Sequence, residues 1–113
     1  MNPMQPGLKT ITPVELSELL TDGADAVQLV DVREPQEVAI NQIQGSVHIP
    51  MNEIPARLSE LDSGRATVVH CHHGIRSHHV GLYLLQNGFD NVANLSGGIA
   101  AYAAAVDPTL GQY

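Results

Sequence analysis

Residues 66–77 read Ala-Thr-Val-Val-His-Cys-His-His-Gly-Ile-Arg-Ser, and they include Cys71, the only cysteine of the chain. The apolar, β-branched run at the start of this stretch predicts a buried strand over residues 66–70. The apolar spacing that follows predicts a helix with a wide buried face, which Asn87-Gly88 ends. The stretch therefore indicates a strand–loop–helix unit with the cysteine at the carboxyl end of the strand.

The rest of the chain continues this alternation. Thr12-Pro13-Val14-Glu15 is a capping box with proline at the first helical position, and it predicts a helix that Asp22-Gly23 ends. The remaining expected segments are a strand at 26–32, a helix at 34–41, an extended piece at 45–50, a helix at 53–61, a strand at 92–95 and a helix at 99–106. Strands and helices that alternate in this way predict an α/β fold, a parallel sheet with helices on both faces. Ligands bind at the carboxyl ends of such strands, where both Asp31 and Cys71 are expected.

Length and composition narrow the class of protein. With 113 residues, 43% of them hydrophobic, the chain predicts a single domain over residues 9–106, between a flexible segment 1–8 and a tail 107–113. The net charge is −7 and the five basic residues are scattered, so we expect no nucleic-acid partner. We see no signal peptide and no apolar run of the ~20 residues that a membrane span needs. A lone cysteine suits a reducing compartment, so we expect a cytoplasmic protein without membrane partners.

The residues after Cys71 suit the binding of an anion. Backbone N–H groups at a helix start are unpaired and stabilise negative charge. Gly74 allows the backbone to curl, Arg76 adds a cation, and Ser77 is expected to cap the next helix or donate to the sulfur. We therefore expect Cys71 to have a lowered pKa and to act as a nucleophile, although free cysteines are also often small buried hydrophobes.

Four motifs in the same order resemble those of single-domain rhodaneses, a family of sulfurtransferases. Cys71–Ser77 matches Cys-x-x-Gly-x-Arg-Ser, and Leu29–Glu34 with Glu37 matches a strand followed by Asp-Val-Arg and a glutamate. Gly45–Pro50 resembles Gly-Ala-x-x-Ile-Pro, and Leu95–Ile99 with Tyr102 resembles Leu-x-Gly-Gly-x-x-x-Trp. The resemblance spans roughly residues 9–106.

This resemblance implies a mechanism and a set of site residues. The Cys71 thiolate would take a sulfane sulfur from a small donor, thiosulfate or a protein persulfide, and pass it to a thiol or protein acceptor, or to cyanide in the test tube. The loop residues would cradle the persulfide, and no cofactor or metal is implied. These loop residues are His72, His73, Gly74, Ile75, Arg76 and Ser77.

Several polar residues allow more than one role. Asp31 either orders the loop or caps the next helix, and Arg33 is expected to form a surface pair with Glu37; we expect structural, supporting roles for both. His72 and His73 either place positive charge near the sulfur, contact a docking partner, or simply face solvent. The neighbouring His78 and His79 point about 100° apart on a helix, so no metal site is expected.

Two other functions fit part of the pattern. His70-Cys71 with a following arginine also resembles a phosphatase loop, but only four residues separate Cys71 from Arg76, one fewer than in that loop. A sulfur carrier or regulatory binding module on the same fold is the second alternative. The scarcity of basic residues near the loop also disfavours free anionic donors such as thiosulfate, so a protein persulfide is an alternative donor.

Overall fold

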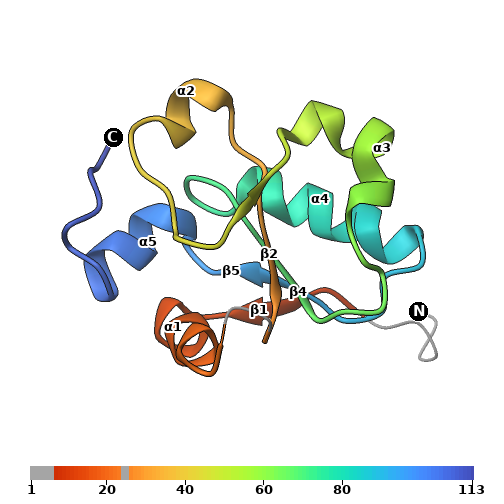
Figure 1. Ribbon diagram of the computed structural model, residues 1–113, viewed down its shortest axis with the longest axis horizontal. Helices are drawn as coiled ribbons and strands as arrows, with labels where there is room; N and C mark the ends of the chain where they lie inside the picture. Colours follow the sequence, from red (N-terminus) through yellow and green to blue (C-terminus); the bar gives the residue numbers. More distant parts are fainter. Residues whose placement is uncertain (1–6, 24–25) are drawn as a thin grey trace.

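Short apolar runs form one five-stranded parallel sheet at the centre of the molecule (Figure 1). The computed structural model describes residues 7–23 and 26–113. The strands lie in the order β1-β5-β4-β2-β3. Their bounds are Lys9–Ile11 for β1, Gln28–Asp31 for β2, Val47–His48 for β3, Thr67–His70 for β4 and Val92–Leu95 for β5. The strand that precedes Cys71 is therefore the central one.

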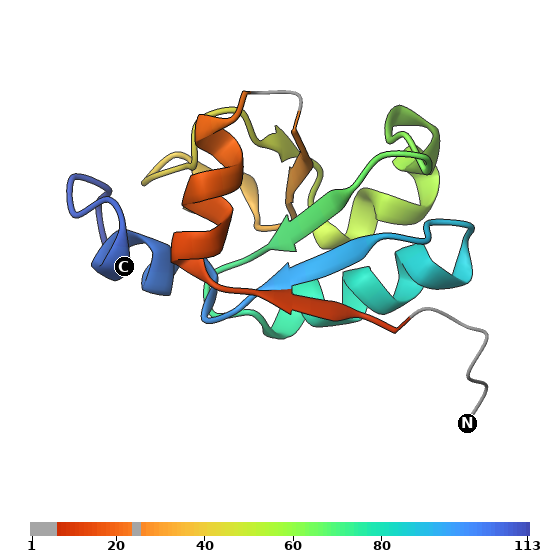
Figure 2. The same cartoon turned by 90° about the horizontal axis from the view of Figure 1, so that it is seen from below.

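Helices cover both faces of this sheet, as the sequence predicts (Figure 2). They are α1 (Pro13–Thr21), α2 (Pro35–Val38), α3 (Ile54–Arg57), α4 (Ile75–Gln86) and α5 (Gly98–Ala105). Side chains of α1 and α5 share a core with alternate strand residues such as Leu29 and Val68. Those of α3 and α4 share a second core with the intervening residues, such as Val30 and Val69. Successive strand residues thus supply the two cores in turn, because side chains alternate across a strand.

The N-terminus of α1 confirms the predicted capping box. The Glu15 N–H donates to Thr12 Oγ1 at 3.1 Å, and the Thr12 N–H donates to Glu15 Oε1 at 2.9 Å. Two otherwise unpaired backbone donors are satisfied in this way, and Pro13 needs no partner at the first helical position.

Two predicted helices are shorter in the structure. The helix expected at 34–41 ends as α2 at Val38, and the backbone and side-chain oxygens of Asn41 accept hydrogen bonds from Arg33 at 2.8 Å each. The helix expected at 53–61 is α3 between two 3₁₀ turns, Met51–Glu53 and Leu58–Glu60. Pro55 lies in the first turn of α3, where proline is tolerated, and the helical geometry ends at Arg57, whose φ of −115° and ψ of 15° precede the second 3₁₀ turn.

The ends of the chain contain one strand that the sequence pattern did not predict. Strand β1 has three residues and pairs only with β5 at the sheet edge, so it offers too little periodicity to detect. Residues 1–6 of the expected flexible segment lie outside the described residues. The tail 107–113 has no helix or strand, but Leu110 packs against the core beneath α1 and α5. Within the described ranges, no helix is long and apolar enough to span a membrane.

Candidate active site

Cys71 follows directly on the central strand β4 and is almost completely buried, with 1% of its surface exposed. It joins the core formed with α3 and α4, which includes Val32 and Val80. Its sulfur nevertheless has polar neighbours. The Gly74 N–H donates to Sγ at 3.1 Å, and the Ser77 hydroxyl oxygen lies 3.4 Å from it.

These polar groups decide the ionisation of the thiol. Burial raises the pKa of Cys71, but hydrogen bonds from the N–H groups of Ser77, Gly74 and Arg76, and from the Ser77 hydroxyl when its proton faces the sulfur, outweigh that effect. The net pKa of the thiol is lower than its ordinary value. Cys71 therefore has the electrostatic environment of a nucleophile rather than of an inert core residue.

Helix α5 holds the loop by donating backbone hydrogen bonds to two of its carbonyl groups. The Ile99 N–H donates to the Cys71 carbonyl at 2.9 Å, and the Ala100 N–H donates to the His72 carbonyl at 3.1 Å. In a trans peptide the C=O and the N–H point in opposite directions. The N–H groups of His72 and His73 are therefore turned away from α5, the orientation that a loop needs to point N–H groups at an anion.

Gly98 makes this contact between α5 and the loop possible. A Cβ at residue 98 would lie 2.3 Å from the His72 carbonyl oxygen and 2.6 Å from that of Cys71. The residue also has φ +64°, in the left-handed region that favours glycine. Gly98, which belongs to the Leu95–Ile99 motif, therefore allows α5 to hold the loop.

Gly74 allows the loop backbone to curl, as the sequence predicts, whereas Ser77 does not cap the helix. Gly74, with φ +108°, is itself the N-cap of α4 and allows the loop to curl into the helix. Ser77 is not the cap, because α4 begins two residues earlier, and its buried side chain lies between Cys71 and Asn94 instead.

Arg76 is paired with Glu37 of α2. Its two terminal nitrogens donate to the two carboxylate oxygens at 2.6 and 2.8 Å. Hydrogen bonds from Arg76 are the largest effect on Glu37 and lower its pKa to about 2. The Tyr113 hydroxyl also donates to this carboxylate at 2.8 Å. The cation that the sequence places in the loop is therefore balanced by a neighbouring anion.

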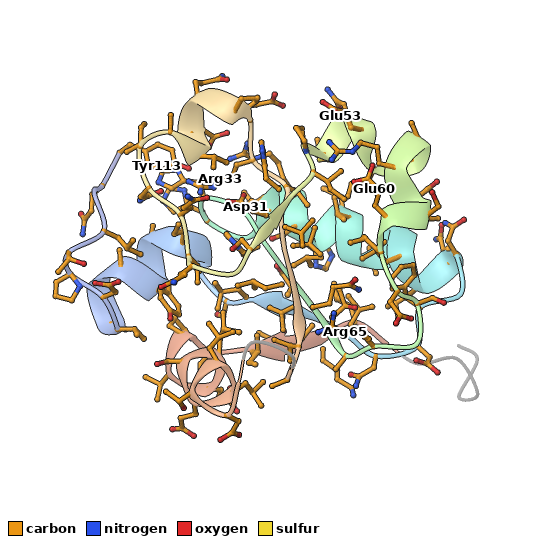
Figure 3. The ribbon with its side chains drawn as sticks, in the orientation of Figure 1. Asp31, Arg33, Glu53, Glu60, Arg65 and Tyr113 are labelled. Atoms are coloured by element: carbon orange, nitrogen blue, oxygen red, sulfur yellow. The ribbon has the colours of Figure 1, made fainter. Side chains whose placement is uncertain are left out.

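Asp31 and Arg33 form a buried pair at the end of β2, beside Tyr113 (Figure 3). Arg33 Nε donates to Asp31 Oδ1 at 2.9 Å, and Nη2 donates to Oδ2 at 2.7 Å. The expected surface pair of Arg33 with Glu37 is wrong. Arg33 is 0% exposed and reaches only the Glu37 backbone carbonyl, because the Asp31 carboxylate is closer and fully buried with it.

His70, the last residue of β4, is buried beside this pair. Its Nε2 lies 3.3 Å from Ser46 Oγ, and the Ser46 hydroxyl donates to the Ile43 carbonyl at 2.7 Å. Nε2 must therefore carry the proton, and among the described residues Nδ1 has no hydrogen-bond partner. Burial is the largest effect on His70 and lowers its pKa to about 4, so the ring is neutral at pH 7.

The other loop side chains face outward to different degrees. Ile75 is 72% exposed and His73 is exposed, whereas His72 is half-buried. The His72 ring stacks on Tyr113, with centroids 3.9 Å apart and planes 11° apart. Burial, followed by the charge of His73, lowers the pKa of His72.

Three residues around the loop were not recognised from the sequence as site residues. Glu37 was noted only in a motif and as an expected partner of Arg33. Asn94 and Tyr113 gave no local signal, since each reaches the loop from a distant segment. Over residues 7–23 and 26–113, no three or more His, Cys, Asp or Glu side chains are grouped so that they could hold a metal ion.

Comparison with known proteins agrees with this geometry. The family model described as "Rhodanese-like domain" matches residues 12–105. A sulfurtransferase of Allochromatium vinosum is 44% identical over 88 residues, which cover 78% of this chain and 81% of that protein. The thiosulfate sulfurtransferase GlpE of Pseudomonas aeruginosa is 35% identical over 95 residues, with 84% of each chain covered. A rhodanese-like domain protein from Staphylococcus aureus has 34% identity and a TM-score of 0.81, over 94% of this chain and 99% of that one. The chain therefore belongs to the rhodanese-like domain family.

Proposed function

We propose that this protein is a sulfurtransferase that carries sulfane sulfur on Cys71, with thiosulfate as a donor. The Cys71 thiolate attacks the sulfane sulfur, the S–S bond of thiosulfate breaks, and sulfite leaves with the bonding electron pair. A nucleophilic acceptor then attacks the outer sulfur of the persulfide and regenerates the Cys71 thiolate. Cyanide would become thiocyanate in this second step, and a thiol or protein acceptor would become a persulfide.

The observation that carries this proposal is the environment of Cys71. A buried thiol accepts the Gly74 N–H at 3.1 Å, has a lowered pKa, and begins a loop whose other N–H groups are turned away from α5. Those N–H groups would stabilise the charge of a persulfide as it develops. The four residues between Cys71 and Arg76 make a tight loop, which supports a sulfur atom over a tetrahedral phosphate as the bound group. The names of the two sulfurtransferase relatives support the same reaction.

The test is the intact mass of the protein after incubation with thiosulfate. We expect the native protein to gain one sulfur atom and to lose it when cyanide is added. Cys71→Ala, which leaves the chain without cysteine, should gain nothing. Uptake of sulfur by the Cys71→Ala protein would contradict the proposal.

A second candidate, a carrier that takes sulfur from a protein persulfide, is favoured by the charges near the loop. Arg76 is already bound to Glu37 through both terminal nitrogens, and the chain has a net charge of −7. The attraction for a small dianion is therefore weak. Fast transfer from a persulfidated protein, with slow loading from thiosulfate, would favour the carrier, and the reverse result would favour thiosulfate as the donor. Either donor suits a reducing compartment such as the cytoplasm, because Cys71 has to remain a thiol between transfers.

A further inference from the structure

Asn94 is a half-buried residue of β5 whose side chain reaches the sulfur-binding loop, residues 71–77, from the neighbouring strand. Its position in the sheet is fixed, because it pairs with Val69 of β4 on one side and with Thr10 of β1 on the other. Its Nδ2 lies 3.0 Å from the Gly74 carbonyl oxygen, and its Oδ1 lies 2.6 Å from the Ser77 hydroxyl.

The Gly74 carbonyl determines which way the Asn94 amide points. A carbonyl oxygen can only accept, so the NH₂ group of Asn94 must face Gly74. The amide oxygen then faces Ser77, and because that oxygen can only accept, the Ser77 hydroxyl must donate to it. The bond of 2.6 Å is short for an O–H···O contact, so this proton is firmly held.

This arrangement leaves the sulfur without the Ser77 proton. A hydroxyl has one proton, and Ser77 Oγ has two possible acceptors, Asn94 Oδ1 at 2.6 Å and Cys71 Sγ at 3.4 Å. While Asn94 holds the proton, Ser77 presents lone pairs to the sulfur and can only accept the S–H of the thiol. Ser77 can stabilise the thiolate only when its proton turns away from Asn94.

We propose that Asn94 is a positioning residue for Cys71: anchored on the Gly74 carbonyl, it draws the Ser77 proton away from the sulfur and thereby keeps the thiol less ionised than the loop alone would. Its relevance to sulfur transfer rests on the proposed role of Cys71 as the nucleophile. Its effect on the ionisation of Cys71 does not depend on that role.

The test is a double-mutant cycle on the pKa of Cys71. The pKa is measured from the pH dependence of the alkylation rate with iodoacetamide, and every label reports Cys71 because the chain has no other cysteine. With Asn94 present, Ser77→Ala should leave the pKa of Cys71 nearly unchanged, since the Ser77 hydroxyl does not donate its proton to the sulfur in that background. In the Asn94→Ala background, Ser77→Ala should raise it by about one unit, the size expected for a hydrogen bond to a charged group.

The cycle separates this effect from general loosening of the loop. Any loosening of the loop by Asn94→Ala is present in both the single variant and the double variant with Ser77→Ala. It therefore cancels when the pKa values of Cys71 in these two proteins are compared. The charged and titratable groups around the loop are unchanged in all four proteins; they are Arg76 with Glu37, the buried Asp31, Arg33 and His70, and the loop histidines 72 and 73. Asn91→Ala, which alters an exposed asparagine of the same segment, should leave the effect of Ser77→Ala as it is in the native protein.

An equal rise in pKa on Ser77→Ala in both backgrounds would overturn the proposal, because Ser77 would then donate to the sulfur whether or not Asn94 is present. If Asn94→Ala does not fold, Asn94→Leu has a similar volume, can neither donate nor accept, and should give the same cycle. Because alkylation needs no sulfur donor, the result stands even if no sulfur is transferred.

Discussion

The loops after β4 and β2 begin side by side, at paired residues His70 and Asp31, yet they satisfy their polar groups in opposite ways. After β4 the backbone holds the sulfur, and the carbonyls behind it are bound by N–H groups of α5. After β2 side chains satisfy each other instead, because the fully buried Asp31 carboxylate and Arg33 guanidinium form an ion pair.

The loop after β2 is closed to a ligand because its charged side chains are paired with each other. The loop after β4 is open, because backbone N–H groups there can still bind one. Arg33 donates to Asp31, Asn41, Tyr113 and the Glu37 carbonyl, so its donors are largely committed. The N–H groups of His72 and His73 are turned away from α5, and in the proposed function they would bind the persulfide. Neighbouring strand ends of one sheet can thus serve stability and chemistry separately.

The largest effect is expected at the closed loop. Asp31→Ala should lower the free energy of unfolding by about 3–5 kcal/mol, because it leaves the buried Arg33 guanidinium without its counter-charge. Urea denaturation measures this change. Glu60→Ala removes an exposed partner of the half-buried Arg57 and serves as the control. An equally small loss for both variants would show that the burial of the Asp31–Arg33 pair does not matter.

The next effect falls on the open loop. Gly98→Ala should cost about 3 kcal/mol, because the new Cβ meets the carbonyls of Cys71 and His72, and it should also abolish sulfur loading. Gly88→Ala is the matched control, with φ +93° but nothing within 4 Å of the new Cβ, and should cost about 1 kcal/mol. Thermal or urea unfolding of the two variants compares them. Retention of sulfur loading in Gly98→Ala would show that α5 does not shape the loop.

The pH dependence of the unfolding free energy tests the buried His70, the last residue of β4. His70 has its pKa lowered by burial from 6.5 to about 4, so the unfolded chain binds more protons than the folded protein between these pH values. Stability contributed by the neutral ring is therefore complete above pH 6.5 and is lost as the pH falls towards 4. We expect a loss of about 2 kcal/mol between about pH 7 and pH 4.5, measured by urea denaturation.

Two substitutions show whether His70 is the source of that loss. His70→Gln should make the unfolding free energy depend less on pH across this window. His79→Gln, which removes an exposed imidazole, should leave the dependence in place. The same pH dependence in native protein and His70→Gln would assign it to other groups.

The smallest effect concerns the contact between the open loop and α2. Glu37→Gln removes the carboxylate that neutralises Arg76, so the guanidinium becomes available to a small dianion. We expect the KM for thiosulfate to fall by about threefold, the range of one weak surface electrostatic interaction. Steady-state transfer to cyanide measures it.

Glu53→Gln is the control for this experiment. It also removes one negative charge and one ion pair with an arginine, Arg57, but on a different part of the surface. An equal fall in KM for both variants would assign the effect to net charge rather than to Arg76.

Much of the fold was predictable because it rests on local patterns. The strand before Cys71, the strand at 92–95, the capped helix after Thr12 and the helices on both faces were all expected and are present. The short edge strand β1 and the breaks around α2 and α3 were missed. Edge pairing, the non-helical backbone of Arg57 and the side-chain contacts of Asn41 leave little trace in hydrophobic periodicity.

The parallel α/β architecture and the place of a lone cysteine at the end of a strand follow from the sequence pattern, because periodicity and strand–helix order are local properties. The partners of the charged and polar side chains depend on tertiary contacts. Arg33 pairs with Asp31 inside the protein, Arg76 with Glu37, and Ser77 with Asn94. Such choices depend on which segments folding brings together and on how completely water is removed there, and neither is written in the spacing of residues along the chain.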